Sequence, residues 1–424
     1  MPLSAFLHSI LPAVAGMIGL SCYILVDTLF VSAALGAGGL AALNLSISIF
    51  SLISGVGQMA GVGGGTDCAL RRGAGKSGSP AFAGALRFGA CASICFFLAG
   101  LFCPREISLL LGADDATLAL TQTYVRMTLL FAPAYILNAI LQGFARNDGA
   151  PRLAMASMLL SSAANIVLDY LFMFPLRMGM FGAVLATGLS ACMSIALLMT
   201  HFAKSTLRPA KAEISLHELA RLLSCGLSAL IGELASAISL ITFNLLLMHI
   251  GGYIAVAAYG VIANVALVAA SVFTGLGQGL QPLASHAYGA GDSAADARLR
   301  RMTAACTGAL SILLFAAVFL FADPIAAAFN SEGSRELAQL AAAGLRIYFA
   351  GYLFAGVNIA AAAYLSAVAR PGRALCLSLL RSCVLLVPAA VVCSTSWGVG
   401  GVWLSFPMTE AAVCALSLAF LHRA

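Results

Sequence analysis

The chain carries a long series of apolar stretches, each long enough to cross a lipid bilayer. A membrane-spanning helix needs about 20 consecutive apolar residues, and twelve such stretches follow one another, at 9–33, 40–68, 84–103, 120–145, 152–174, 181–203, 218–248, 254–286, 301–321, 338–367, 374–395 and 399–421. Only 9% of the 424 residues are charged, whereas a soluble domain carries about 25%. The sequence therefore predicts an all-α polytopic membrane protein with twelve transmembrane helices.

Turn-forming residues separate these stretches, and one polar segment divides the chain in half. Glycine and proline mark the breaks "RRGAGKSGSP" at 71–80 and "RNDGAP" at 146–151. The longest polar segment, "KSTLRPAKAEISLHE" at 204–218, follows the sixth stretch. We therefore predict an N-terminal six-helix lobe over 1–203, a link over 204–218 and a C-terminal six-helix lobe over 219–424.

The two halves resemble each other in sequence. "GVGQ" at 55–58 recurs as "GLGQ" at 275–278, an offset of 220 residues, and the same offset relates Pro104 to Pro324, Arg126 to Arg346, Asn138 to Asn358 and Pro151 to Pro371. Each half has an even number of predicted helices, so both halves start on the same side of the membrane. In transporters with such parallel repeats, the substrate path lies between the repeats. We therefore predict two pseudo-symmetric lobes with a path between them.

The positive charges are divided unevenly between the two sides of the predicted membrane protein. Of the 22 Lys and Arg residues, seventeen lie in or near the segments after even-numbered stretches or in the C-terminal tail, and five lie in or near the other segments: Arg105, Arg126, Arg177, Arg335 and Arg346. The positive-inside rule assigns the richer side to the cytoplasm. We therefore expect an integral protein of the cell (inner) membrane, in contact with membrane lipid, with both termini and the 204–218 link in the cytoplasm. Because the net charge of +6 is scattered over short loops, we expect no nucleic-acid partner.

Four acidic residues lie well inside the predicted spans: Asp27, Asp169, Glu233 and Glu410. A carboxylate there costs roughly 3 kcal/mol or more and marks a functional site by default. The alternative is a neutral carboxyl group that joins two helices by hydrogen bonds. We interpret Asp27 and Asp169 as functional, leave Glu233 open between the two roles, and favour the structural role for Glu410.

The surroundings of Asp169 indicate an ion site. Asn165 lies four residues earlier, so the two side chains share one helix face. An amide oxygen beside a carboxylate suits a hard cation, and Thr187 could add a hydroxyl. Burial also disfavours the charged carboxylate, which favours uptake of a proton. These residues indicate ion coupling and leave Na⁺ and H⁺ open.

The sequence lacks the signatures of common enzymes and of nucleotide-driven pumps. It contains no H-E-x-x-H, no G-x-S-x-G and no G-x-x-x-x-G-K-[ST]. The glycine-rich "GVGQMAGVGGG" at 55–65 lies within an apolar stretch, where close helix packing explains it better than phosphate binding. We therefore expect a monomeric protein that is not an enzyme, has no cofactor, and is driven by a gradient of Na⁺ or H⁺.

Four segments in order, spread over most of the chain, resemble the multidrug and toxic compound extrusion (MATE) family: "LVDTLFVSAALGAGGLAAL" at 25–43, "GFARNDGAPRLAM" at 143–155, "NIVLDYLFMFPLRMGMFGAVLAT" at 165–187 and "GLGQGLQPLASHAYGAGD" at 275–292. The resemblance implies a V-shaped pair of six-helix lobes that work by alternating access. It also implies antiport, in which Na⁺ or H⁺ enters while a small cationic or amphipathic compound leaves.

The resemblance implies a cation-coupling site in the N-terminal lobe, made by Asp27, Asn165, Asp169 and Thr187 with Asn138 as a neighbour. If the ion is Na⁺, Asp27, Asn165 and Asp169 would be its metal ligands. The C-terminal lobe lacks this pattern, because the 220-residue offset takes Asn165 to Leu385 and Asp169 to Ala389.

Some relatives in this family also pair an acid in helix 7 with another in helix 10. Glu233 matches the first position, but helix 10 has no acid here and Asn358 is its nearest polar residue. We therefore expect the N-terminal lobe to bind the coupling ion. Glu233 would instead contact a cationic substrate or hold a helix contact.

The substrate path is predicted with less detail. Tyr23, Tyr135 and Tyr259 suit planar hydrophobic cations, although aromatic residues that face lipid would be ordinary anchors. The main alternative is a lipid-linked glycan flippase of the same superfamily. That function would require a cationic central cavity, whereas the inner polar groups here are mainly acidic. A membrane enzyme would need a paired nucleophile and base, which the sequence does not offer.

Overall fold

The structure, a computed structural model, describes residues 3–115, 117–207, 215–329 and 334–422. These residues are almost entirely helical: α1 (Leu3–Gly73), α2 (Ser79–Phe102), α3 (Pro104–Leu110), α4 (Leu118–Leu130), α5 (Ala132–Asn147), α6 (Pro151–Met173), α7 (Gly179–Phe202), α8 (Leu216–Gly289), α9 (Ser293–Leu320), α10 (Ala322–Ala328), α11 (Arg335–Phe349), α12 (Tyr352–Ala367), α13 (Pro371–Leu379), the π-helix η2 (Leu380–Val384) and α14 (Leu386–His422). The predicted link at 204–218 includes residues 208–214, which lie outside the described residues, so its extent stays a prediction.

Glycine kinks divide the longest helices into separate membrane spans. Gly36, Gly252 and Gly398 have φ of 63°, 63° and 58° with strongly negative ψ, a backbone region that is essentially restricted to glycine. Without its kink, the 74-residue α8 would be roughly 110 Å long, far longer than the roughly 30 Å hydrocarbon core. Each kink falls between two predicted spans.

The number of spans agrees with the prediction of twelve helices. By length and composition, the described residues contain eight candidate spans, or ten when each of two bent helix pairs is counted as one span. That count treats α8 as one span and residues 371–422 as another. Dividing these at Gly252 and Gly398 gives twelve. The predicted fold class, an all-α polytopic membrane protein, is confirmed.

The repeat between the two halves extends to their irregular features. The fourth span bends by 49° where α4 meets α5, and the tenth bends by 48° where α11 meets α12. These bends lie at Phe131 and at Gly351, which are related by the 220-residue offset. The short helices α3 and α10, which the sequence analysis did not predict, also occupy matching places. The two lobes are therefore built on one plan.

Local sequence explains where several of these helices begin. Proline occupies the first turn of α2, α3, α5, α6 and α13, where its missing N–H costs no hydrogen bond. Helix α8 begins with a capping box, in which Ser215 Oγ accepts a hydrogen bond from the Glu218 N–H at 3.2 Å and the Glu218 carboxylate accepts one from the Ser215 N–H at 3.1 Å. Asp292 caps the start of helix α9, where its carboxylate accepts a hydrogen bond from the Ala295 N–H at 2.9 Å.

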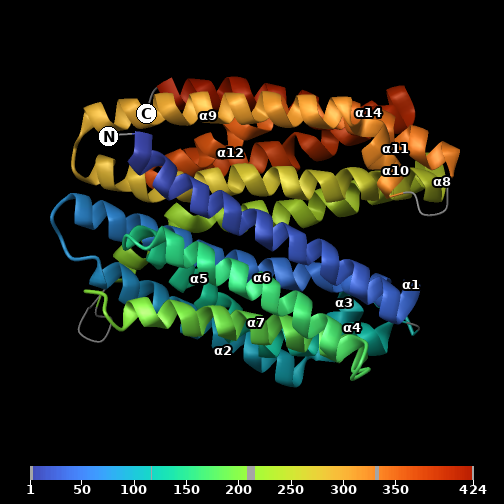
Figure 1. The fold of residues 1–424 in the computed structure, drawn as a ribbon, viewed down its shortest axis with the longest axis horizontal. Coiled ribbons are helices and arrows are strands. Elements are labelled where there is room, and N and C mark those ends of the chain that lie inside the picture. Colours follow the sequence, from blue (N-terminus) through green and yellow to red (C-terminus); the bar gives the residue numbers. More distant parts are fainter. Residues whose placement is uncertain (1–2, 116, 208–214, 330–333, 423–424) are drawn as a thin grey trace.

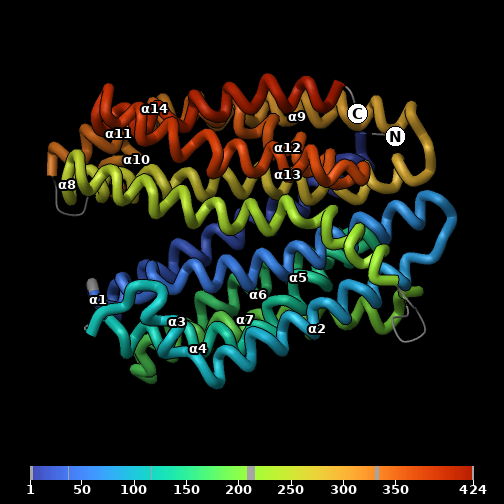
Figure 2. Tube along the Cα trace, turned by 180° about the vertical axis from the view of Figure 1, so that it is seen from behind, coloured from blue at the N-terminus to red at the C-terminus, as the bar shows by residue number. Residues whose placement is uncertain are grey.

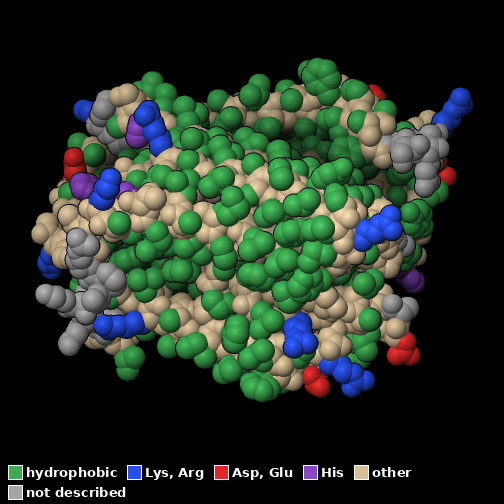
Figure 3. All heavy atoms as spheres, turned by 60° about the horizontal axis from the view of Figure 1, so that its bottom comes forward, with side chains coloured by type: hydrophobic (Ala, Val, Ile, Leu, Met, Phe, Trp, Pro, Cys, Tyr) green, Lys and Arg blue, Asp and Glu red, His purple; other side chains and the backbone are tan. Residues whose placement is uncertain are grey.

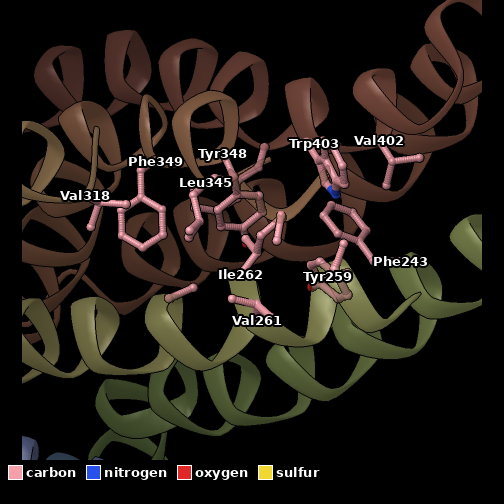
Figure 4. Close-up of a cluster of buried hydrophobic side chains, with 14 of the residues drawn as sticks. Phe243, Tyr259, Val261, Ile262, Val318, Leu345, Tyr348, Phe349, Val402 and Trp403 are labelled. Atoms are coloured by element: carbon pink, nitrogen blue, oxygen red, sulfur yellow. The ribbon is translucent and has the colours of Figure 1, made fainter. Parts of the chain in front are cut away.

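Each lobe has a hydrophobic core of its own. Figures 1 and 2 show α1–α7, in blue to green, in one layer and α8–α14, in yellow to red, in the other. The first part of α1 is the exception, because it begins beside the second layer and crosses to the first (Figure 1). The core of the second lobe is rich in aromatic residues (Figure 4), and its Tyr348 and Phe406 rings stack with centroids 4.2 Å apart. The core of the first lobe includes Phe82, which stacks on Phe202 at 5.2 Å.

The outer surface is suited to a bilayer. Figure 3 shows a broad hydrophobic band across the middle of one face, with charged side chains mainly toward the two ends. Large apolar side chains are exposed on several helices, including Leu245 at 67% and Val167 at 64%. Such a surface would be unstable in water, so the chain is an integral membrane protein.

The two lobes meet closely at one end of the molecule and diverge at the other. Figure 1 places both chain termini at the end where the lobes meet, and the ribbons separate toward the opposite end in both views. At the closed end, Gly63 packs on the Leu222 carbonyl and Gly226 packs on the Met59 carbonyl, with no room for a side chain. Arg71 also pairs there with Glu218 at 2.8 Å. This arrangement is the V shape that the family resemblance implied.

Backbone contact at Gly226 gives a test of this packing. In Gly226→Ala the added methyl group would overlap the Met59 backbone, and overpacking of this kind costs about 1–3 kcal/mol. We expect a lower melting temperature for the purified protein in detergent, measured by scanning fluorimetry. Gly232→Ala on the same helix is the matched control, because a Cβ there meets no described heavy atom within 4 Å. Equal melting temperatures for the two variants would contradict the close contact.

Candidate functional site

Two carboxyl groups meet inside the N-terminal lobe, one from Asp27 on α1 and one from Asp169 on α6. The Asp169 side chain is fully buried, and the two carboxyl groups lie close enough to interact electrostatically. Two ionised carboxylates in such a place repel each other, and neither has a proton to donate to the other. Within the described part of the chain, Asp27 Oδ1 and both carboxylate oxygens of Asp169 are buried and have no hydrogen-bond partner. A shared proton or a bound cation would offset the negative charge of such a pair.

Asn165 and Thr187 belong to the same site. The four-residue spacing of Asn165 and Asp169 predicted that these two side chains share one face of the helix. Asn165 is fully buried on α6, and its Nδ2 donates to Thr187 Oγ1 of α7 at 3.1 Å. The Thr187 hydroxyl donates in turn to the Ala183 carbonyl at 3.1 Å. Asn165 Oδ1 is buried and has no donor among the described residues. One turn of α6 thus presents amide and carboxylate oxygens that all lack a partner, which is the ligand type that a hard cation requires.

Asn138 shares a cavity wall with Thr187. Its Oδ1 accepts hydrogen bonds from Ser194 Oγ at 2.7 Å and from Gln142 Nε2 at 3.3 Å, so this oxygen is already engaged. Asn138 and Thr187 both line an internal cavity of about 120 Å³. The structure therefore brings Asn138 and Thr187 to the wall of one cavity, while Asp27, Asn165 and Asp169 lie outside the lining.

The cavity lies against α1, α5, α6, α7 and α8, and two of the three predicted path tyrosines line it. Tyr23 is on the wall, and its phenol interacts electrostatically with three membrane acids: Asp27, Asp169 and Glu233. Tyr135 is also on the wall, with its ring 5.5 Å from Phe50 and its buried hydroxyl without a partner among the described residues. Tyr259 is placed elsewhere, in the core of the C-terminal lobe against Phe243 (Figure 4).

Glu233 is held by a contact between the two lobes. Gln58 Nε2, from the second part of α1, donates to Glu233 Oε1 of α8 at 2.8 Å, and Gln58 lines the cavity. Sequence reasoning did not identify Gln58 as a functional residue. The repeat could have indicated it, because "GVGQ" and "GLGQ" end in Gln58 and Gln278, and both glutamines line the same cavity.

A second acidic site lies in the C-terminal lobe and is neutralised by the chain itself. Arg381 of η2 donates from Nε and Nη2 to Glu410 Oε1 at 3.1 and 2.7 Å. Glu410 is almost fully buried, and its Oε2 accepts from Asn358 Nδ2 at 2.6 Å. Ser417 Oγ donates to Asn358 Oδ1 at 2.8 Å. The positive-inside rule places Arg381 among the seventeen cytoplasmic charges, whereas its side chain pairs with a buried acid.

The two lobes fill equivalent positions with different chemistry. The 220-residue offset takes Asn358 to Asn138, Arg381 to Ser161 and Glu410 to Ser190. The three N-terminal counterparts all line the cavity, and Ser161 Oγ lies 3.4 Å from Ser190 Oγ. Positions that surround a cavity in one lobe are therefore occupied by an internal ion pair in the other.

Comparison with known proteins decides the family. The MatE family model matches residues 12–171 and 229–392, which is most of the chain. The chain belongs to the MatE family. Its members include named multidrug export proteins, so this MATE protein is a membrane transporter and not an enzyme.

Relatives match the MATE protein over nearly its full length. The multidrug export protein MepA of Staphylococcus aureus (strain NCTC 8325 / PS 47) is 25% identical over 419 residues, which cover 97% of this chain and 92% of MepA. MepA of Staphylococcus saprophyticus subsp. saprophyticus is 25% identical over 422 residues, which cover 97% and 91%. A crystal structure of a MATE protein in complex with MaL6 aligns with a TM-score of 0.93 and 22% identity, covering 98% of this chain and 94% of that one. The fold of two lobes is therefore that of MATE proteins.

The Arg381–Glu410 pair predicts a clear effect on stability. Arg381→Met would leave the Glu410 carboxylate buried without its cation, and breaking a buried pair in this way costs up to about 3–5 kcal/mol. We expect a marked fall in melting temperature for Arg381→Met and partial recovery in Arg381→Met/Glu410→Gln, where no charge remains. Thermal unfolding of the purified proteins would measure both. A double variant no more stable than Arg381→Met would show that the two side chains act independently.

Proposed function

We propose that this MATE protein exports small cationic or amphipathic compounds from the cell in exchange for Na⁺ or H⁺. The names of its MepA relatives support multidrug export, and the absence of a nucleotide-binding motif in the sequence favours an ion gradient as the driving force. The observation that carries the proposal is the buried pair of Asp27 and Asp169, in which three carboxylate oxygens have no donor among the described residues.

The acid pair supplies the coupling mechanism in this proposal. With one proton shared or one Na⁺ bound, the negative charge of the pair is reduced and the site can stay buried between α1 and α6. Without the cation, the two carboxylates repel each other and favour a hydrated arrangement. The ion can drive transport only because it binds one conformation more tightly than the other. Movement of α1 against α6 is the simplest change that would separate the two carboxyl groups.

The closed end of the molecule is the cytoplasmic end in this proposal, so the described conformation faces outward. The uneven distribution of Lys and Arg supports this orientation, with both termini in the cytoplasm of a cell whose membrane lipid surrounds the hydrophobic band. Asp67 and Arg221 join the lobes at this end at 2.8 Å, next to the Arg71–Glu218 pair. These ion pairs would have to break when the transporter opens inward.

Substrate would meet Glu233 and the cavity tyrosines between the lobes. Glu233 offers a negative charge to a cationic group, and Tyr23 and Tyr135 offer aromatic faces. The Gln58–Glu233 hydrogen bond also supports the helix-contact role for this acid. A substrate cation that displaces Gln58 would therefore act directly on the contact between the lobes.

We propose that the C-terminal lobe takes no coupling ion. Arg381 already supplies a cation to Glu410, so a second cation at Glu410 would have no free charge to neutralise, and we assign Glu233, the other acid of this lobe, to the substrate or to the helix contact. In this proposal the lobes have different roles because their acids are compensated differently. A cation from solution compensates Asp27 and Asp169, and Arg381 compensates Glu410. We further propose that the transporter acts as a monomer.

A lipid-linked glycan flippase is the second candidate function, and one observation favours it. Arg146 lines the cavity, and a flippase would require cationic groups there for a pyrophosphate. This one arginine supports a flippase. Three membrane acids, Asp27, Asp169 and Glu233, give stronger support to the export of cations. Lipid-scrambling vesicles containing the purified protein would separate this function from gradient-driven dye efflux.

Removing either membrane aspartate should abolish coupled export. In Asp27→Asn and in Asp169→Asn the remaining carboxyl group no longer needs to share a cation, so transport loses its dependence on the ion gradient. We expect at least a tenfold loss of ethidium efflux from cells that contain normal amounts of protein in the membrane. Asp115→Asn, at an exposed position, is the control. Normal efflux by both variants at normal expression would refute the coupling site, and loss of both proteins from the membrane would favour a structural role.

Glu233→Gln should affect substrates and spare the ion. The amide keeps an oxygen that can accept from Gln58 but loses the negative charge, so cationic compounds should bind less tightly while uncharged amphipathic ones are little affected. We expect a changed export profile over a panel of dyes, with an unchanged dependence of the rate on ion concentration. A shift of that ion dependence in Glu233→Gln, but not in Asp169→Asn, would reverse the assignment of the two acids.

A further inference from the structure

Arg146 is a buried cation without a counter-charge among the residues that the structure describes. It lies in the last turn of α5, only 7% exposed, and its side chain lines the cavity. Within the described part of the chain, its Nε and Nη1 atoms are buried and have no hydrogen-bond acceptor. Nearby arginines differ, because Arg71 pairs with Asp67 and Arg72 pairs with Asp148. Arg146 is thus set apart from the ion pairs at the closed end.

The described surroundings of Arg146 offer no acid to compensate its charge. The polar side chains that share the cavity wall with it are neutral, and they include the amides of Gln58, Asn138, Gln142 and Gln278. Asp148, two residues away, is already occupied, since its carboxylate also accepts from Ser205 Oγ at 2.6 Å and contacts His201 Nε2 at 2.8 Å. The cavity wall therefore carries a net positive charge at this place.

A guanidinium in such a place favours an anion as its partner. An unpaired buried charge is strongly unfavourable, and arginine does not relieve the cost by losing its proton. Carboxylates match the two parallel N–H groups of a guanidinium, and a halide can accept from the same donors. The neighbouring amide N–H groups could add further donors to such an anion.

We propose that the cavity binds a small monovalent anionic group at Arg146. The group would be either the carboxylate of a zwitterionic substrate or chloride from solution. Tyr23, on the same wall, interacts electrostatically with Asp27, Asp169 and Glu233. These acids lie outside the lining, so Arg146 supplies the charge on the wall itself. The zwitterionic substrate rests on the proposed export function, whereas the chloride site does not.

Chloride binding can be tested without any substrate. The melting temperature of the purified full-length protein would be measured in sodium chloride and in sodium gluconate at equal ionic strength. We expect a saturable rise with chloride in the wild type and none in Arg146→Met, which keeps the length of the apolar stem. Arg152→Met, an exposed arginine at the start of α6, should retain the rise.

Two dyes distinguish the source of the anionic group. Rhodamine 110 is a zwitterion with a free carboxylate, and rhodamine 123 is its cationic methyl ester. We expect Arg146→Met to weaken binding of rhodamine 110 by about tenfold or more, as loss of hydrogen bonds to a charged group implies. Binding of rhodamine 123, measured by fluorescence polarisation, should change less than threefold. Arg146→Lys should keep part of the preference for rhodamine 110.

Each outcome decides the proposal. A selective loss of rhodamine 110 binding supports a substrate carboxylate, and a chloride effect alone supports an anion from solution. Equal losses for both dyes with no chloride effect would mean that Arg146 only maintains structure, which overturns the proposal. No chloride effect and no change for either dye would overturn it as well. If the wild type binds neither dye, the proposed export of such compounds fails, and the chloride measurement still decides whether the anion site exists.

Discussion

The need to compensate two neighbouring carboxyl groups inside the membrane shapes the N-terminal lobe. Asp27 and Asp169 come from different helices and meet where no described donor reaches three of their four oxygens. Asn165 adds another unpartnered oxygen one turn away. A soluble protein could hydrate such a group, but a bilayer core cannot. In the proposed mechanism, the lobe therefore depends on a proton or a cation from solution.

The C-terminal lobe meets the same constraint with a residue of its own. Arg381 and Asn358 both donate to Glu410, and a π-helical turn places the arginine for this contact. π-Bulges in helices often occur at functional sites. Two lobes with one plan thus differ in whether the chain itself supplies a cation to the buried acid: Glu410 has Arg381, and Asp169 has no such partner among the described residues. Between them, Gln58–Glu233 and the contacts at the closed end connect the lobes, so a change in one can reach the other.

The fold was predictable because the membrane restricts its design. Apolar runs and glycine or proline breaks indicated all twelve spans, and the repeat indicated two lobes. The helical spacing of Asn165 and Asp169 indicated part of the site. The remaining contacts join residues far apart in the chain, such as Gln58 with Glu233 and Arg381 with Glu410, which periodicity cannot reveal. Burial of Tyr259 against Phe243 depends likewise on packing of the whole lobe. The bends between α4 and α5 and between α11 and α12 were not predicted, because the apolar pattern of the sequence continues across each bend.

A count of exchangeable cations at the acid pair tests the coupling mechanism most directly. Purified protein without substrate would be titrated with Na⁺ and with acid in weakly buffered solution, with ²²Na⁺ binding and proton release measured together. We predict one cation, Na⁺ or H⁺, bound per wild-type molecule at the pair, and loss of that cation in Asp169→Asn. Undiminished cation binding in both Asp27→Asn and Asp169→Asn would contradict the proposal that these two carboxyl groups couple the ion to transport.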